Sequence, residues 1–496
     1  MPRLSLIMLA ILVLATATVS SAQRTVPADE IIAKVQDYQP VNYDGVIISG
    51  DLDLGRLNPP EVHSVISIVN STVQNASFNG VSFEKDASFW GTIFRNASFN
   101  KTTFLQNSDF SNVSFHHASF VGAAFVSPVI FDGAKFISNV SFEDSQFQKD
   151  TSFNNVRFMG DADLNYTNFL YYTYFTEALF MKNALFSDVK FLGTSDFSSA
   201  NFSLGANFFG SQFGATSFGN CSFNGPARFG LTRFSGLSSY GDALFSEEAN
   251  FNLARFSDAA YFSKAHFKDK ALFGLVKFED IASYEGAAFD GELNLKNAQI
   301  STMLLDGAFF GKNAKINLKD VDFKRLKAHW NEIKDQVVYD PGVYLGLIDN
   351  YRVLGWHSDQ DDCYYEYRRL NQAEKGFEFS KAIDILAWLS CGYGVRPGYT
   401  VAWAVMTILV FALIFWKGDG IRRSAKPLQG PVEKDSVPER AIFRNALFFS
   451  TCIFLSQGPI DFLPVGKHRY FVIVEGILGW LLLALFLVTL GRIMIR

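Results

Sequence analysis

A polar stretch, FLSQGPIDFLP at residues 454–464, lies between two apolar runs near the C-terminus. The run before it (446–455) is too short to cross a bilayer, whereas the run after it (470–490) is long enough. Polar backbone at membrane depth is tolerated only where protein buries it or where it lines a water-filled path. The residues in question are Ser456, Gln457, Gly458, Pro459, Ile460 and Asp461. Either subunits assemble around this stretch, or it lies at the membrane surface and the flanking helices are anchors.

Enzyme motifs are missing from the sequence. It contains no H-E-x-x-H, no phosphate-binding loop, no G-x-S-x-G and no C-x-x-C. We therefore expect neither an enzyme nor a cofactor. The net charge of -5 gives no reason to expect nucleic-acid binding.

Clusters of potential metal ligands have simpler interpretations. Asp359, Asp361 and Asp362 lack the Gly and the closing Glu of a calcium loop, and they fit the acidic first turn of a helix. We predict no metal site. The cysteines are too few and too scattered for a disulfide scaffold, but a bridge between Cys363 and Cys391 is open in an oxidising compartment.

Two segments are long and apolar enough to span a membrane. Residues 399–416 carry no charge, and residues 470–490 carry one acid, Glu475. The linker between them is basic, with Lys417, Arg422, Arg423, Lys426, Lys434 and Arg440. The positive-inside rule places this linker in the cytoplasm. We therefore predict a multi-pass protein of the cell membrane.

The N-terminus has the layout of a secretory signal. Arg3 precedes an apolar core (6–15) and a small-residue exit at 20–22, although an uncleaved signal anchor would place the next domain on the same side. The region up to about residue 395 should then lie outside the cytoplasm. Among nine N-x-S/T sequons, the candidates for glycosylation are Asn75, Asn96, Asn112, Asn139 and Asn220.

A repeat explains the 52 phenylalanines. From Phe78 to Phe289 an aromatic or large apolar residue recurs every five or six positions, with a small residue two places before it. Residues two apart on a strand face the same side, so the small and the large residue both point inward. Cys221 takes a small inward position, and the histidines at 116–117 fit outer corners.

Four such units would close one turn of a square coil, with spare residues of the six-residue steps at corners. About forty units give roughly ten coils, about 48 Å long at the spacing of stacked strands. The pattern resembles the pentapeptide-repeat family of right-handed quadrilateral β-helices, in its Phe-centred form. Solenoid ends must be covered, and residues 28–36 are expected to form a short helix that does so.

The last hundred residues resemble the pore module of two-transmembrane potassium channels. The match covers roughly 395–492: 446–455 takes the place of the pore helix, 456–460 the place of the family's T-V-G-Y-G filter, and Asp461 and Pro464 match residues after the filter. Only Gly458 of the filter survives. Pro459 removes an N–H and Ile460 resists the backbone angles of the family's second Gly, which argues against the usual potassium geometry.

The sequence thus predicts a right-handed quadrilateral parallel β-helix, then a helical linker domain, then two transmembrane helices with a pore-loop-like segment. The expected segments are a signal peptide (1–23), a cap with opening strands (24–75), the repeat (76–300), a helical juxtamembrane domain (301–395) and the two-transmembrane module (396–496). Two functions remain open. One is a cation channel, a homo-oligomer and specifically a tetramer, with an altered filter; the other is a membrane-anchored scaffold that binds a cell-surface ligand and has a non-conducting pore module.

Overall fold

The computed structural model describes residues 23–376, 378–423, 442–458 and 461–494. These form two units, Met1–Val343 and Tyr344–Arg496, which are described separately. The predicted signal peptide (1–23) lies outside the described residues apart from its last one, and so do Lys426, Lys434 and Arg440 of the basic linker.

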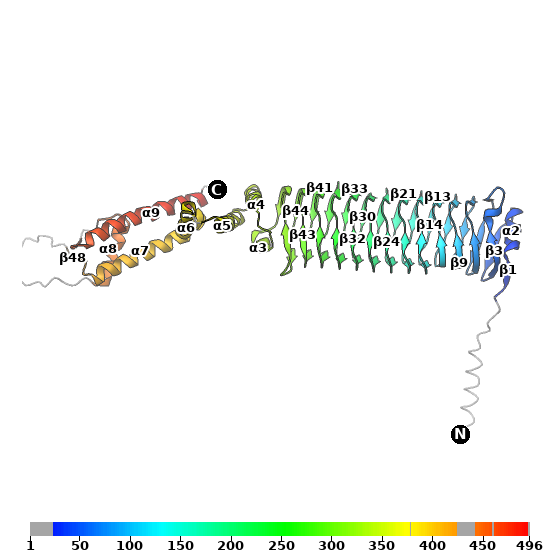
Figure 1. Ribbon diagram of the computed structural model, residues 1–496, viewed down its shortest axis with the longest axis horizontal. Helices are drawn as coiled ribbons and strands as arrows, with labels where there is room; N and C mark the ends of the chain where they lie inside the picture. The colour runs from blue at the N-terminus through cyan, green and yellow to red at the C-terminus, as the bar shows by residue number, and fades with distance from the viewer. Residues whose placement is uncertain (1–22, 377, 424–441, 459–460, 495–496) are drawn as a thin grey trace, which may run out of the picture. The chain divides into compact units, whose positions relative to one another are not determined.

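The first unit is a parallel β-solenoid with four strands to a turn. From β13 (Ala124–Phe125) to β36 (Ala249–Asn250) each strand pairs in parallel with the fourth strand along the chain, as β15 (Lys135–Phe136) does with β19 (Arg157–Phe158). The stack runs from β1 (Thr25–Pro27) to β47 (Asp322–Lys327), about 14 turns (Figure 1). At about 4.8 Å per turn it is roughly 65 Å long.

The expected small-x-large rule describes the core. Ala76 and Phe78 are buried and Ser77 between them is half-buried, and the same alternation continues along the solenoid. Rings one turn apart stack, for example Phe245 on Phe267 with centroids 4.7 Å apart and planes at 0°. Each buried ring contributes about 1.5–3 kcal/mol before entropy is subtracted. This ladder of rings is the hydrophobic core.

Some polar residues in the small inward positions form hydrogen bonds to the backbone, whereas the buried Ser108 hydroxyl has no partner among the described residues. Thr102 Oγ1 donates to the Phe78 carbonyl at 2.7 Å, and Cys221 Sγ to the Phe197 carbonyl at 2.8 Å. In both cases the acceptor belongs to the preceding turn. Cys221 is fully buried, as predicted, and burial raises the pKa of its thiol. A carbonyl of the preceding turn can therefore accept a hydrogen bond from Thr, Ser or Cys in the core.

The corners differ from the prediction in one respect. Left-handed residues recur every eleven positions, as at Gly122, Gly133, Asp144 and Asn155. They lie in five-residue steps and not in the six-residue steps, where we expected the corner Gly and Asn. A left-handed residue turns the chain tightly, whereas a six-residue step has an extra residue with which to bend.

The solenoid also extends beyond the Phe repeat. Upstream, Val26, Ile48 and Val73 lie in the same ladder as Phe94. Downstream, segments where we expected the ladder to fade form β43 (Glu292–Asn294), β44 (Gln299–Leu304), β46 (Lys315–Asn317) and β47, the last in place of the helical spacing expected from residue 320. Aliphatic residues occupy the ring positions there, so counting aromatic residues underestimates the number of turns.

Short helices lie at the two ends of the solenoid. Helix α2 (Ala28–Gln36) matches the predicted range and buries Ala28, Ile31 and Val35 beside the first turns. Near the other end, α3 (Trp330–Ile333) buries Trp330 and Ile333. Both bury apolar side chains that an open solenoid end would leave in water.

The second unit is helical. Its elements are α4 (Pro341–Leu354), α5 (His357–Glu374), α6 (Phe379–Cys391), η2 (Gly392–Gly394), α7 (Pro397–Lys417), β48 (Ile421–Arg423), α8 (Phe443–Phe454), β49 (Phe462–Pro464) and α9 (His468–Met494). Helices α7 and α9 are long and apolar enough to cross a membrane, and only 22% and 11% of their apolar windows are buried. A core helix of a soluble protein would be mostly buried. Cys363 and Cys391 are free thiols, so the bridge considered above is not formed.

Candidate functional site

Helix α8 packs between the two long helices. Phe411 and Phe415 of α7 form one apolar cluster with Ala446 and Phe449 of α8, and the rings of Phe415 and Phe449 meet edge to face at 5.1 Å. Helix α8 begins beside the end of α7, where the rings of Trp416 and Phe443 lie 5.6 Å apart. The short apolar run is therefore a helix, close to the range 446–455 predicted for it.

The end of α8 lies far along α9. An added Cβ on Gly479 would lie 2.3 Å from the Phe454 carbonyl oxygen, so the two backbones touch there. Gly479 is eleven residues, or about 16 Å, from the start of α9.

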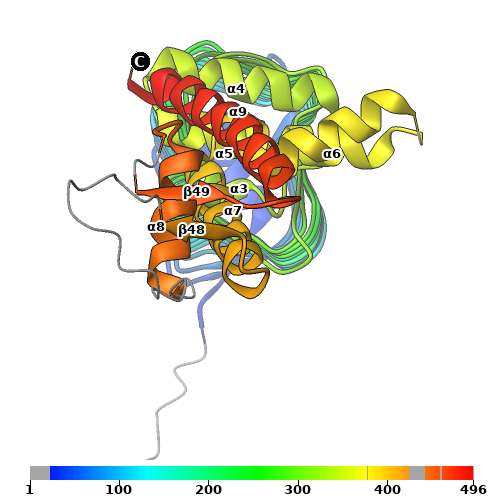
Figure 2. The ribbon, with the colours of Figure 1, turned by 90° about the vertical axis from the view of Figure 1, so that its left-hand side faces the viewer.

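After α8 the chain comes back to the level at which α7 ends. β49 pairs antiparallel with β48, which directly follows α7, and both lie side by side in Figure 2. The chain thus runs along α8 away from the α9 start, and β49 lies back at the level of that start. We call the described residues of 443–464 the re-entrant hairpin, because α8 and β49 leave and regain the same level of α9.

The predicted filter-like residues lie on the returning arm. Ser456, in a left-handed conformation, Gln457 and Gly458 follow the end of α8, and Asp461 precedes β49; all four are exposed. Backbone bonds from Ser456 N to Ile453 O (2.9 Å) and from Gln457 N to Cys452 O (2.8 Å) close the helix end. Pro459 and Ile460 lie outside the described residues.

A buried acid joins the three helices. Glu475 of α9 is fully buried and contacts Ser450 Oγ of α8, which also lies 2.8 Å from the Ile408 carbonyl of α7. The second carboxyl oxygen of Glu475 has no hydrogen-bond partner among the described residues. The sequence showed Glu475 as the single acid of an apolar run, but not its partner, which lies 25 residues earlier.

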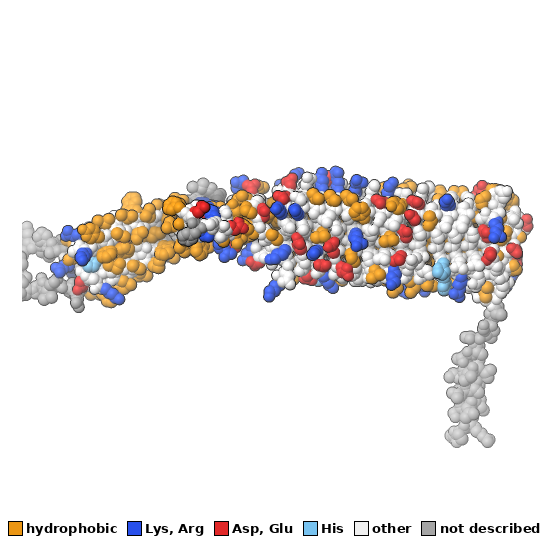
Figure 3. All heavy atoms as spheres, in the orientation of Figure 1, with side chains coloured by type: hydrophobic (Ala, Val, Ile, Leu, Met, Phe, Trp, Pro, Cys, Tyr) orange, Lys and Arg blue, Asp and Glu red, His pale blue; other side chains and the backbone are white. Residues whose placement is uncertain are grey.

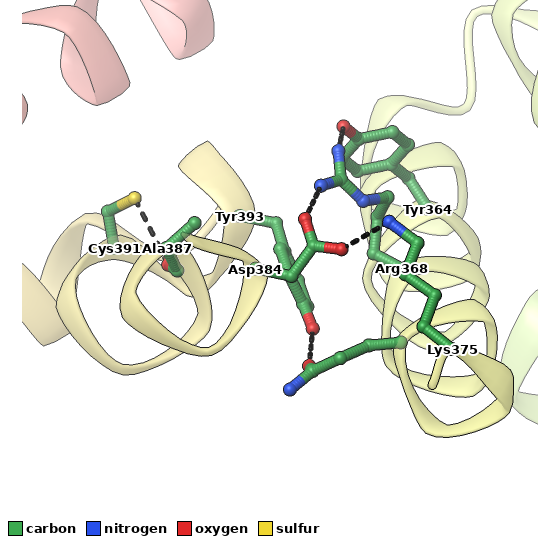
Figure 4. A network of polar contacts seen from close by, with 8 residues as sticks. Tyr364, Arg368, Lys375, Asp384, Ala387, Cys391 and Tyr393 are labelled. Carbon is green, nitrogen blue, oxygen red and sulfur yellow. Dashed lines mark hydrogen bonds and ion pairs between the residues drawn. The ribbon is translucent and has the colours of Figure 1, made fainter. Parts of the chain in front are cut away.

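A polar network joins α5 and α6, the two helices that precede the long apolar helix α7 (Figure 4). Asp384 of α6 accepts from Lys375 at 2.5 Å and from Arg368 at 2.7 Å. Lys375, and then Arg368, hold the pKa of the Asp384 carboxyl below its usual range. Burial, together with the nearby charge of Asp384, raises the pKa of Tyr393 to about 12, and its hydroxyl bonds Gln372.

Helix α5 contacts one end of each long helix. Asp362 pairs with Arg396, just before α7, at 2.5 Å, and Asp361 lies 4.0 Å from Arg492 near the end of α9. The Arg492 guanidinium also lies over the Tyr364 ring at 5.0 Å. The acids at 361 and 362, interpreted above as a helix start, therefore pair with arginines near the two helix ends.

The five candidate glycosylation sites are all exposed on the solenoid: Asn75, Asn96, Asn112, Asn139 and Asn220. The side-chain amide of Asn75 donates to Asp51 and that of Asn96 to Asn75, both at 2.8 Å. Both line a polar groove of about 600 Å³, together with His117 and Asn139. A glycan on Asn75 or Asn96 would have to displace this ladder of side chains.

One cluster was missed in the sequence. His63 lies 2.6 Å from Glu84 through Nδ1 and 3.3 Å from Glu61 through Nε2. His63 and Glu84 are 21 residues apart, which is close to one turn of the solenoid. The repeat period could therefore have predicted that they lie next to each other on adjacent turns. Both ring nitrogens face carboxylates, so the His63 side chain joins one turn of the solenoid to the next.

The comparisons with known proteins concern the solenoid. A family model described as pentapeptide repeats (9 copies) matches residues 120–168 and 251–299. These two segments of the solenoid therefore carry pentapeptide repeats. A search of the curated proteins found no match. A solved structure of trypsin-treated QnrB1, described as a plasmid-mediated fluoroquinolone resistance protein, is 18% identical over 41% of this chain and 82% of that one, with a TM-score of 0.20.

Proposed function

We propose that this pentapeptide-repeat protein is an integral membrane protein whose helical units assemble as a homo-oligomer around the re-entrant hairpin and conduct cations. The observation that carries the proposal is the hairpin itself. Its helix ends against Gly479, about 16 Å along α9, and its returning arm is polar and exposed.

The interior of a bilayer offers no hydrogen bonds to polar backbone groups. If α7 and α9 span it, Ser456, Gln457 and Gly458 lie near its middle while facing away from their own helices. Exposed polar backbone at that depth needs protein or water beside it. Further copies of the chain around a shared water-filled path supply both, and a tetramer is the arrangement that the resemblance to potassium channels implies.

The proposed orientation rests on charge and connectivity. The signal-like N-terminus favours an extracytoplasmic solenoid, and the basic linker favours a cytoplasmic position for the connection between α7 and α9. Helix α5 pairs with the start of α7 and with the end of α9, which is consistent with both lying on the solenoid's side of the membrane. The hairpin would then enter from the cytoplasm.

Selectivity follows from the residues on the returning arm. Asp461 is exposed and would attract cations to the entrance, while Gln457 offers an amide oxygen. The replacement of T-V-G-Y-G by Ser456–Ile460 argues for monovalent cations without strong potassium preference.

The test is flux through the purified full-length protein in liposomes. We expect potassium and sodium flux, a several-fold decrease in Asp461→Asn, and altered selectivity in Gln457→Ala. Asp269→Asn, an exposed acid on the solenoid, is the matched control and should leave flux unchanged. Absence of flux from a verified tetramer would overturn the channel.

The alternative, a membrane-anchored scaffold, is favoured by the polar groove on the solenoid, which a surface ligand could occupy. If the anchor is all that the second unit provides, a chimera in which an unrelated single-span anchor replaces residues 440–496 retains full function in cells. Loss of function in this chimera argues for the hairpin.

A further inference from the structure

The contact between Ser450 and Glu475 lies inside the bundle formed by α7, α8 and α9. Both side chains are fully buried. Ser450 Oγ lies within hydrogen-bond distance of two oxygens, the Ile408 carbonyl at 2.8 Å and Glu475 Oε1. This polar contact joins all three helices at one point.

Counting protons indicates the ionisation state of the acid. A serine hydroxyl has one proton to donate, and a backbone carbonyl can only accept. If Ser450 donates to Ile408, the contact with Glu475 is a hydrogen bond only when the carboxyl group supplies its own proton.

The second carboxyl oxygen of Glu475 also indicates a neutral acid. Glu475 Oε2 is buried and has no donor among the described residues. An ionised carboxylate with at most one donor is costly in an apolar interior, whereas a neutral acid needs fewer donors.

The charged groups nearest along the three helices are six or more residues from Ile408, Ser450 and Glu475. Lys417 is nine residues from Ile408 on α7, Arg444 is six residues from Ser450 on α8, and Arg469 is six residues from Glu475 on α9. The titratable groups His468 and Cys452 belong to the same elements, and Cys452 is two residues from Ser450 and so on another side of α8. In the part of the chain that the structure describes, none of these groups forms a hydrogen bond or an ion pair with Glu475.

We propose that Glu475 is a proton-binding site: in the packed bundle it is a neutral acid that donates to Ser450 and so ties the re-entrant hairpin to α7 and α9. Release of the proton to water removes this donor and leaves a charge between the helices, which weakens the packing of α8. Resting on the channel proposed above, the site would make flux depend on pH.

The ionisation state can be tested without any flux. Infrared difference spectra of the full-length protein, titrated between about pH 5 and pH 9, should show a protonated carboxyl band at neutral pH. The band should disappear in Glu475→Gln and remain in Glu374→Gln, an exposed acid on α5. Ser450→Ala, which removes the acceptor, should shift the band to higher frequency. A carboxylate at neutral pH, whether bare or bound to a cation, would overturn the proposal, as would a band that Glu475→Gln leaves unchanged.

Flux provides the second readout. Wild-type flux should change with pH across the titration of the band, and Glu475→Gln should remove that dependence. If the band is present but the tetramer passes no ions, the channel fails while the proton site stands. If flux is present and its pH dependence persists in Glu475→Gln, the regulatory role of the site is refuted and the channel stands.

Discussion

The two units of this protein satisfy their polar groups in different ways. In the solenoid each turn bonds to the turns before and after it, and even inward hydroxyls such as Thr102 find a carbonyl on the preceding turn. In the helical unit, apolar side chains cover the outside of α7 and α9 (Figure 3). The polar residues Ser456, Gln457 and Gly458 after α8 are exposed. The solenoid pairs its strands within one chain, whereas the helical unit leaves apolar helix faces and a polar arm exposed.

This difference shows where function can be sought. A surface that the chain itself completes can tolerate substitution, because its stability comes from rings stacked inside. A surface that stays incomplete in one chain requires something outside the chain. Substitutions in the two units test this contrast.

Phe197→Ala should destabilise the solenoid by about 3–5 kcal/mol, because it removes a buried ring and leaves a cavity. Phe197 stacks between Phe175 at 4.9 Å and Phe218 at 4.8 Å. Denaturant unfolding followed by circular dichroism measures the change. Phe209→Ala, whose side chain is 46% exposed, is the control and should change stability by no more than about 0.5 kcal/mol. Equal effects of the two would contradict the stacked core.

Gly479→Ala should destabilise the helical unit by about 1–3 kcal/mol, since the added Cβ would overlap the Phe454 carbonyl oxygen and force α8 away. Gly476→Ala is matched to it, because a Cβ at Gly476 meets no atom within 4 Å. That control should gain about 0.5–1 kcal/mol from helix propensity. Thermal unfolding in detergent measures both, and the re-entrant hairpin would be refuted if both variants were stabilised.

Asp384→Asn should destabilise the helical unit by about 1–2 kcal/mol, because Lys375 and Arg368 lose a charged acceptor. The pKa of Asp384 is lower in the folded than in the unfolded state. Its contribution is therefore fully present above the usual Asp pKa of about 3.9 and is lost as pH falls through the folded-state pKa. Unfolding measured across acidic pH should show this loss in the wild type and not in Asp384→Asn.

Tyr240→Phe should stabilise the solenoid by about 1 kcal/mol, because the Tyr240 hydroxyl is buried without a hydrogen-bond partner among the described residues. Burial also raises the pKa of that hydroxyl. The ring would keep its place between Phe218 and Phe262. Tyr166→Phe, 51% exposed, should change the unfolding midpoint little. A loss of stability in Tyr240→Phe would mean that the hydroxyl has a partner.

Much of the fold could be predicted because the repeat makes distant contacts local. Phe78 and Phe99, one turn apart, obey the same spacing rule as every other pair, so a short pattern specifies which residues stack. The predicted number of turns was wrong because aliphatic residues replace the aromatic ones near the ends of the solenoid. Val26, Ile48 and Leu293 occupy inward ladder positions without being aromatic, and counting Phe therefore gave too few turns.

The candidate site could be predicted only in part. The sequence alone determined the stacked coil and two apolar helices around a polar stretch, since both follow from periodicity and composition. The folded structure was needed to show that α8 ends against Gly479 and that Ser450 contacts Glu475. It was also needed to show that Asp361 and Asp362 pair with arginines at two helix ends. The physical reason is that turns of a solenoid meet at a constant interval along the chain, whereas packed helices meet wherever their side chains fit, and no period in the sequence records that fit.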